Sequence, residues 1–124
     1  MADTLEGLRE SGCLACNDEA TPVEMLPGIV RTLNEGRNAS LHELRMAKGS
    51  SVPAHTHPHE QIGYLASGRF RFRLGDSWRE LSAGDSWCVP GGIEHEVEVL
   101  EDTVAIDVFS PPREEYRDPK WAAG

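Results

Sequence analysis

Short runs of alternating apolar and polar residues, separated by glycine and proline, restrict the fold of this chain more than any other feature. The clearest run is RFRFRL at residues 69–74, where apolar side chains alternate with arginines. A period of two places alternate side chains on opposite faces of a β-strand, and residues 23–110 show no helical period. The expected strands cover residues 28–33, 40–46, 62–66, 69–74, 78–81, 86–89, 95–100 and 103–109. These strands predict an all-β sandwich or barrel.

The length of the chain fits a single core. A chain of 124 residues suits one domain, because two cores of half that size would each bury too little surface to be stable. We expect an irregular N-terminal extension over residues 1–22, a β-barrel over residues 23–116 and a C-terminal tail over residues 117–124.

The charge balance excludes some partners. Twelve basic and 21 acidic side chains give a formal charge of −9, which repels the phosphates of nucleic acids and anionic membrane surfaces. An anionic small molecule would need a local positive charge in its site. The sequence has no apolar run long enough to cross a bilayer and no export signal at its start, so we expect a cytoplasmic protein.

The cysteines carry little functional signal. Cys13 and Cys16 form one C-x-x-C pair, whereas a structural zinc site usually combines two such pairs. A redox motif would need a βα context that this stretch lacks. We interpret the pair as incidental, with the role of the extension left open, and we expect Cys88 to be a small buried hydrophobic residue.

A histidine-rich stretch is the first candidate site. Residues 53–61 read PAHTHPHEQ and hold three of the five histidines. His55 and His57 lie two positions apart, so on a strand they point the same way and can bind one ion. Taken alone, the stretch is equally typical of a solvated loop. Pro58 breaks the alternation, so we expect His59 to lie beside such a site or to be exposed.

A second stretch decides between these readings. Residues 84–95 read GDSWCVPGGIEH, a strand, a tight turn and a histidine. The two stretches together resemble the paired signature motifs of the cupin superfamily, with glutamine in place of the usual glutamate at position 61 and valine in place of asparagine at position 99. The resemblance implies a double-stranded β-helix, or jelly-roll barrel. It also implies that one divalent metal is bound by His55, His57, Gln61 and His95.

The glutamine has consequences for the metal. Its carbonyl oxygen is neutral, so four neutral ligands leave the full charge on the ion, which favours Lewis-acid chemistry over a trivalent state. Glu60 is the alternative ligand if the loop register shifts. The same ligand set accepts zinc, nickel, iron(II) or manganese, and the sequence does not decide between them.

Three residues near the C-terminus are candidates for binding a substrate. Asp107 is a lone carboxylate in an apolar strand and must face solvent, a polar cavity or a cation, because burial without a partner is costly; from this strand alone, a solvated face is the preferred interpretation. Phe109 shares its face, and Arg113 follows a Ser-Pro-Pro corner, where it can grip a carboxylate. His42, on an apolar face, is expected in the core, with a place in the cavity as the alternative.

The stretches HPHEQIGYLASG and DVFSPPREEY resemble one group of small cupins, the pectin-degradation proteins of the KdgF type. This resemblance implies an enzyme that converts 4,5-unsaturated uronates into linear keto sugars, with Asp107, Phe109 and Arg113 as the catalytic and substrate-binding set. It also implies a small anionic sugar as substrate and a homodimer. The alternatives are a metal-dependent dioxygenase, a polyketide-type cyclase, or a cupin that binds a metal or small molecule without catalysis.

Overall fold

The computed structural model describes residues 12, 14 and 21–113 of the chain. Within them the chain forms ten β-strands: β1 (Val23–Leu26), β2 (Ile29–Glu35), β3 (Ser40–Met46), β4 (Ser51–His55), β5 (Glu60–Ser67), β6 (Arg69–Leu74), β7 (Ser77–Ser82), β8 (Ser86–Val89), β9 (His95–Val99) and β10 (Thr103–Ser110). The N-terminal extension and the C-terminal tail expected from the sequence lie outside the described residues, apart from a few positions. Among the described residues, no helix is long and apolar enough to cross a membrane.

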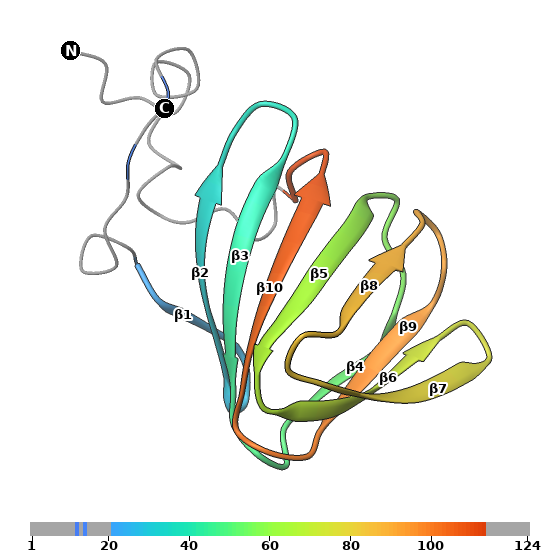
Figure 1. Cartoon of the computed structure of the whole chain (residues 1–124). Helices are drawn as coiled ribbons and strands as arrows, with labels where there is room; N and C mark the ends of the chain where they lie inside the picture. The colour runs from blue at the N-terminus through green and yellow to red at the C-terminus, as the bar shows by residue number, and fades with distance from the viewer. Residues whose placement is uncertain (1–11, 13, 15–20, 114–124) are drawn as a thin grey trace.

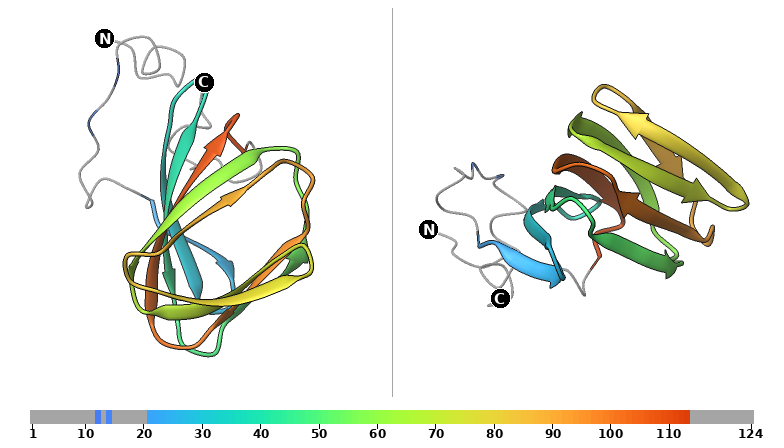
Figure 2. Two further views of the ribbon diagram at one scale, coloured as in Figure 1. Left: turned by 45° about the vertical axis from the view of Figure 1, so that its right-hand side comes forward. Right: turned by 90° about the horizontal axis from the view of Figure 1, so that it is seen from below.

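The strands form two antiparallel sheets that face each other (Figure 1). The larger sheet has the order β1-β2-β3-β10-β5-β8 and the smaller one the order β4-β9-β6-β7. Consecutive strands that lie in different sheets, as β3 and β4 do, produce the jelly roll that the resemblance to cupins implies. The two views in Figure 2 show the sheets curving around a common interior. The sequence did not reveal β1.

The core fills the space between the sheets. Apolar side chains at alternate positions point inward, and those that are almost fully buried include Leu65, Phe70, Phe72, Val89, Val97 and Val99. The alternation predicted for residues 69–74 is confirmed, because the phenylalanines are buried while Arg69 and Arg71 lie on the outer face. There the arginines of β6 pair with glutamates of β7, β9 and the following turn, and Arg71 also covers the ring of Trp78 at 4.7 Å.

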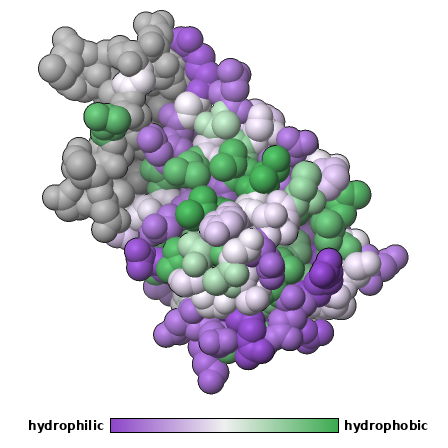
Figure 3. All heavy atoms as spheres, in the orientation of Figure 1, coloured by the Kyte–Doolittle hydropathy of each residue, from purple (hydrophilic) through white to green (hydrophobic). Residues whose placement is uncertain are grey.

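The outer face of the larger sheet is unusually apolar. Leu41, Ile62, Tyr64 and Val108 are all exposed on it, and Val108 is paired in register with both Leu41 and Ile62. Figure 3 shows hydrophobic residues gathered across the middle of this face. Cys88 lies on the same face and is exposed, so the expectation of a buried cysteine was wrong. The residues on either side of it, Trp87 and Val89, are the ones that point inward.

Candidate metal centre

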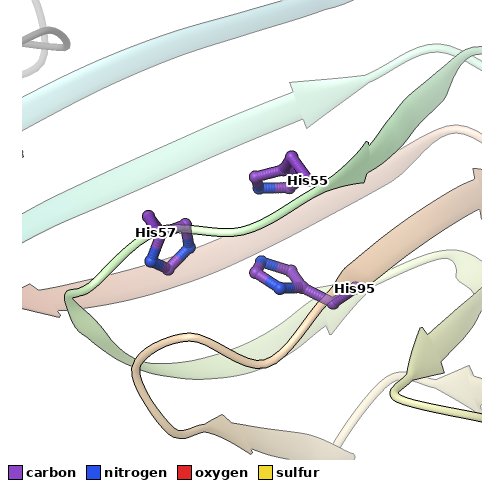
Figure 4. Close-up of side chains that lie close together, drawn as sticks. All are labelled: His55, His57 and His95. Atoms are coloured by element: carbon purple, nitrogen blue, oxygen red, sulfur yellow. The ribbon is translucent and has the colours of Figure 1, made fainter.

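Three histidines from different parts of the chain meet inside the barrel. His55 ends β4, His95 begins β9, and His57 lies in the loop between β4 and β5. Figure 4 shows the three rings turned toward a common space. Their ligand nitrogens lie within 4.8 Å of one another. The sequence placed His55 and His57 on one strand; in the structure β4 ends at His55, and His57 reaches the site from the loop.

Backbone carbonyls orient all three rings. The Nδ1 atoms of His55, His57 and His95 lie 2.9, 3.1 and 2.9 Å from the carbonyl oxygens of Pro53, His59 and Ile93, respectively. A carbonyl oxygen only accepts, so each Nδ1 carries a hydrogen, and in the neutral tautomer that this selects the lone pair lies on Nε2. Histidines that bind metals are typically held in this way by their second nitrogen.

The free lone pairs fit a cation. Nε2 of His95 is buried and has no hydrogen-bond partner among residues 21–113. Nε2 of His57 lies 3.1 Å from Oε1 of Gln61, so two acceptor atoms face each other, an arrangement that a shared positive ion would stabilise. Burial lowers the pKa of His57, and it lowers the pKa of His95 to about 4. Both rings are therefore neutral near pH 7, as metal ligands must be.

The structure also places the two candidate ligands from β5. Gln61 is buried, and its side-chain amide points its oxygen toward His57 and donates from Nε2 to Oδ1 of Asp107 at 3.0 Å. Glu60 is exposed on the opposite face of the strand. Gln61 is therefore the fourth group beside the histidines, and an amide oxygen with imidazole nitrogens suits a divalent ion.

Two close contacts hold the histidine loops together. His55 and His95 are register partners where β4 pairs with β9. The backbone N–H of Gly92 donates to the carbonyl oxygen of His57 at 2.9 Å. A Cβ at position 91 would lie 2.2 Å from the carbonyl oxygen of Pro58. Glycine is needed at position 91 because the turn before His95 packs directly against the backbone of the loop that carries His57.

Asp107 lies next to this cluster and points inward. It is 5% exposed, so the sequence-based preference for a solvated face was wrong. Its Oδ1 atom accepts hydrogen bonds from Nε2 of Gln61 at 3.0 Å and from Nε1 of Trp87 at 2.7 Å, which offset the cost of burial. Burial raises the pKa of Asp107 to about 6, against the opposing effect of these donors and of Arg113.

Trp87 and Gly63 are two contributors that the sequence did not reveal. A Cβ at position 63 would lie 2.1 Å from ring atoms of Trp87, so the missing side chain makes the slot that the indole occupies. Positions 63 and 87 are register partners on β5 and β8. The only signal in the sequence was a glycine inside a strand, which often marks a close approach.

Phe109 and Arg113 complete the wall of the site. The ring of Phe109 lies edge-on to His57, with centroids 5.5 Å apart, and the guanidinium of Arg113 lies 5.3 Å from the Phe109 centroid. Ser110 anchors the corner before Arg113 by donating from Oγ to the carbonyl of Asn38 at 2.6 Å. His42 also packs against Phe109, with centroids 4.8 Å apart, in the buried position expected for a core residue.

These groups surround one cavity. An inner space of about 70 Å³ is lined by His55, Gln61, His95, Asp107 and Arg113 together with apolar core side chains. A wider mouth of about 280 Å³ lies beside it, and His55 and Arg113 line both spaces. The site therefore combines a cluster of metal-binding donors, a carboxylate and an arginine at the inner end of an open mouth.

The jelly roll and the three-histidine cluster define the class of protein. The cupin domain family matches residues 42–109 of this chain. An RmlC-like cupin from Shewanella frigidimarina NCIMB 400 superimposes with a TM-score of 0.80 and 25% identity, over 84% of this chain and 95% of its own. The chain belongs to the cupin superfamily.

Within the cupins, the chain belongs to the family of the pectin degradation protein KdgF. It is 34% identical over 103 residues to that protein from Dickeya dadantii (strain 3937), which covers 80% of this chain and 94% of the relative. The structure of KdgF from Halomonas sp. superimposes with a TM-score of 0.81 and 31% identity, over 86% of this chain and 99% of that structure.

Proposed function

We propose that this protein is a metal-dependent isomerase that converts 4,5-unsaturated uronates from pectin or alginate breakdown into linear keto sugars. The observation that carries the proposal is one cavity lined by His55 and His95 of the histidine cluster together with Asp107 and Arg113. The similarity to KdgF, a protein named for pectin degradation, supports a sugar acid as the substrate.

The ligand set would be His55, His57, Gln61 and His95. A divalent ion held there would act as a Lewis acid on an oxygen of the substrate. Zinc, nickel, iron(II) and manganese all suit these donors. The chain itself supplies the remaining functions: Arg113 binds the carboxylate of the uronate, Phe109 packs against the sugar face and Asp107 moves the proton.

The reaction is an isomerisation, so no co-reactant is needed. The hydroxyl at C1 loses its proton as the bond between C1 and the ring oxygen breaks, which leaves an aldehyde at C1 and an enolate at C5. The carbon at C4 then gains that proton, and the enolate at C5 becomes a ketone. Asp107 is the group placed to take up the first proton and to deliver one to C4, because it is the carboxylate that lines the inner cavity.

The test is the ultraviolet absorbance of an unsaturated uronate monomer, since the C4=C5 double bond conjugated to the carboxylate absorbs and is lost on ketonisation. Metal-loaded protein should accelerate the decay, and the Asp107→Asn variant should lose at least about 100-fold in kcat, the range of general acid–base catalysis. Full turnover by Asp107→Asn would refute the proposed role of Asp107. Oxygen consumption with an organic substrate would favour a dioxygenase. Metal binding without any turnover would favour a protein that binds a metal or small molecule without catalysis.

We further propose that the protein is a cytoplasmic homodimer. The apolar outer face of the larger sheet, with Leu41, Ile62, Tyr64 and Val108, is the surface on which a second copy would pack. Light scattering after gel filtration should give the dimer mass for the parent and the monomer mass for Ile62→Lys. A parent protein that elutes as a monomer at high concentration would refute the dimer. Cell fractionation tests whether the protein is cytoplasmic.

A further inference from the structure

The mouth of the cavity lies between an edge strand of one sheet and an edge strand of the other, as the described residues form them. β1 ends the larger sheet and β4 ends the smaller one (Figure 2). Met25 and Leu26 of β1 line the mouth on one side, and residues 52–56 line it on the other. Met25 and Leu26 also line the inner cavity beside the histidine cluster. A ligand that enters through this mouth must pass these two side chains.

Neighbouring residues on a regular strand point to opposite faces, so Met25 and Leu26 need a special backbone to share one cavity. The pairing of β1 with β2 provides it. Glu24 pairs with Val30 and Leu26 pairs with Ile29, so Met25 is an extra residue with no partner in the register. This is a β-bulge, a device that redirects side chains and is frequent at barrel rims and beside active sites.

The turn after β1 holds this strand beside the mouth. Gly28 has a φ of 80°, a conformation that glycine adopts without strain. Its carbonyl oxygen accepts a hydrogen bond of 2.8 Å from the backbone N–H of Ala47, in the connection that leads to β4. The turn after β1 is therefore hydrogen-bonded to the same connection that leads into β4 on the other side of the mouth.

We propose that Met25 and Leu26 are specificity-determining residues: they select one small carboxylate-bearing ligand with an apolar face, a single sugar acid, for the histidine cluster. Arg113 faces the carboxylate from the polar side of the cavity, and the two apolar side chains contact the C–H face of the ring. The mouth of about 280 Å³ lies just below the usual range for ligand pockets, roughly 300–1,000 Å³, so its size suits one sugar unit.

The first test follows access to the metal and does not depend on turnover. Zinc-loaded full-length protein is mixed with EDTA, and zinc release is recorded. Met25→Ala widens the mouth and should release zinc severalfold faster, while Met25→Trp narrows it and should release zinc severalfold more slowly. Met25 lies outside the core cluster, so both variants are expected to fold, which urea unfolding checks. Val23→Ala, on the same strand but not lining the mouth, should match the parent.

The second test measures the proposed isomerase reaction. The use of an unsaturated uronate as its substrate rests on the proposed function. Met25→Ala should raise KM for an unsaturated uronate monomer roughly tenfold, the effect of lost apolar contact in a pocket. Its kcat should stay within about twofold, because the contact acts equally on substrate and transition state. Met25→Leu should restore KM, and Val23→Ala should leave it unchanged.

The outcomes separate the two proposals. If folded Met25→Ala and Met25→Trp both release zinc at the parent rate, these side chains do not control access, and the inference is wrong whatever the activity. If the parent does not convert uronates but zinc release responds in the two opposite directions, Met25 does control access to the histidine cluster and the proposed reaction is wrong.

Discussion

The indole Nε1 of Trp87 lies 2.7 Å from Oδ1 of Asp107, and the same oxygen accepts a second hydrogen bond from Gln61. Both side-chain hydrogen bonds to Asp107 from the described residues therefore end on one oxygen, which leaves Oδ2 for a ligand in the cavity. The same amide of Gln61 turns its oxygen toward His57. Trp87 packs in the apolar core and thus helps to orient both the carboxylate of Asp107 and the amide of Gln61, a proposed metal ligand.

We predict that Trp87→Phe keeps the packing of the ring but loses the hydrogen bond to Asp107. The free energy of unfolding should fall by about 2 kcal/mol, the value of a buried hydrogen bond to a charged group. The kcat should fall at least about tenfold, because a misplaced catalytic group lowers the rate sharply. Urea unfolding and steady-state rates measure the two effects.

Trp78→Phe is the matched control for this change. Trp78 is partly exposed on the outer face, beneath Arg71, so its replacement should alter neither kcat nor KM. A Trp87→Phe protein with the kcat of the parent would show that the orientation of Asp107 does not depend on the indole.

We predict that Gly91→Ala weakens metal binding. The added Cβ would meet the carbonyl oxygen of Pro58 at 2.2 Å, and this backbone atom cannot move without the loop that carries His57. Displacing a ligand by such a shift should lower zinc affinity by roughly 10- to 100-fold, the range seen when the groups that orient ligands are lost. Competition with a chromophoric chelator measures the affinity.

The control for the glycine substitution is Gly36→Ala. A Cβ at position 36 would find only the carbonyl oxygen of Ala39, at 3.4 Å, an ordinary contact. This variant should bind zinc as the parent does. Equal zinc affinity in Gly91→Ala and Gly36→Ala would mean that the contact between the turn and the loop does not position the histidines.

Local patterns predicted much of this structure. Period-two alternation placed Phe70 and Phe72 inside and the arginines outside correctly, because one face of the strand is buried. The resemblance to the cupin motifs pointed to His55, His57 and His95, which the fold brings together. β1 was missed because residues 23–26 read VEML, a run too short to show a period.

Interactions between distant residues account for what the sequence could not predict. Asp107 points inward because Gln61 and Trp87 donate hydrogen bonds to it inside the barrel. These donors lie 46 and 20 positions away in the sequence, so the strand that carries Asp107 gave no sign of them. The shared direction of Met25 and Leu26 depends on the register of β1 against β2. Cys88 was expected inside because its neighbours are apolar, yet alternation within β8 leaves it exposed.

We predict that His42 makes the protein less stable at acidic pH. Burial, reinforced by the positive charges of Arg31 and Arg113, lowers the pKa of His42 from 6.5 to about 3. Below pH 6.5 the unfolded chain binds a proton that the folded protein does not, so the free energy of unfolding falls as pH falls from 6.5 toward 3. The slope for one such proton approaches about 1.4 kcal/mol per pH unit.

The variant His42→Gln removes this titrating group, and the measurement is urea unfolding of parent and variant at several pH values. The difference in unfolding free energy between the two proteins should change with pH between 6.5 and 3 and should be constant above about pH 7.5. A difference that is constant over the whole range would show that His42 titrates alike in the folded and unfolded states.

The most direct test of the account is to titrate metal into chelator-treated protein and to follow the absorbance decay of an unsaturated uronate monomer at each step. The proposed set of four ligands around one ion predicts a rate that rises linearly with added metal and levels off at one ion per chain, with His95→Ala inactive at every ratio. A rate equal to the uncatalysed decay at all metal levels, or full activity without metal, would contradict the proposal of a metal-dependent isomerase.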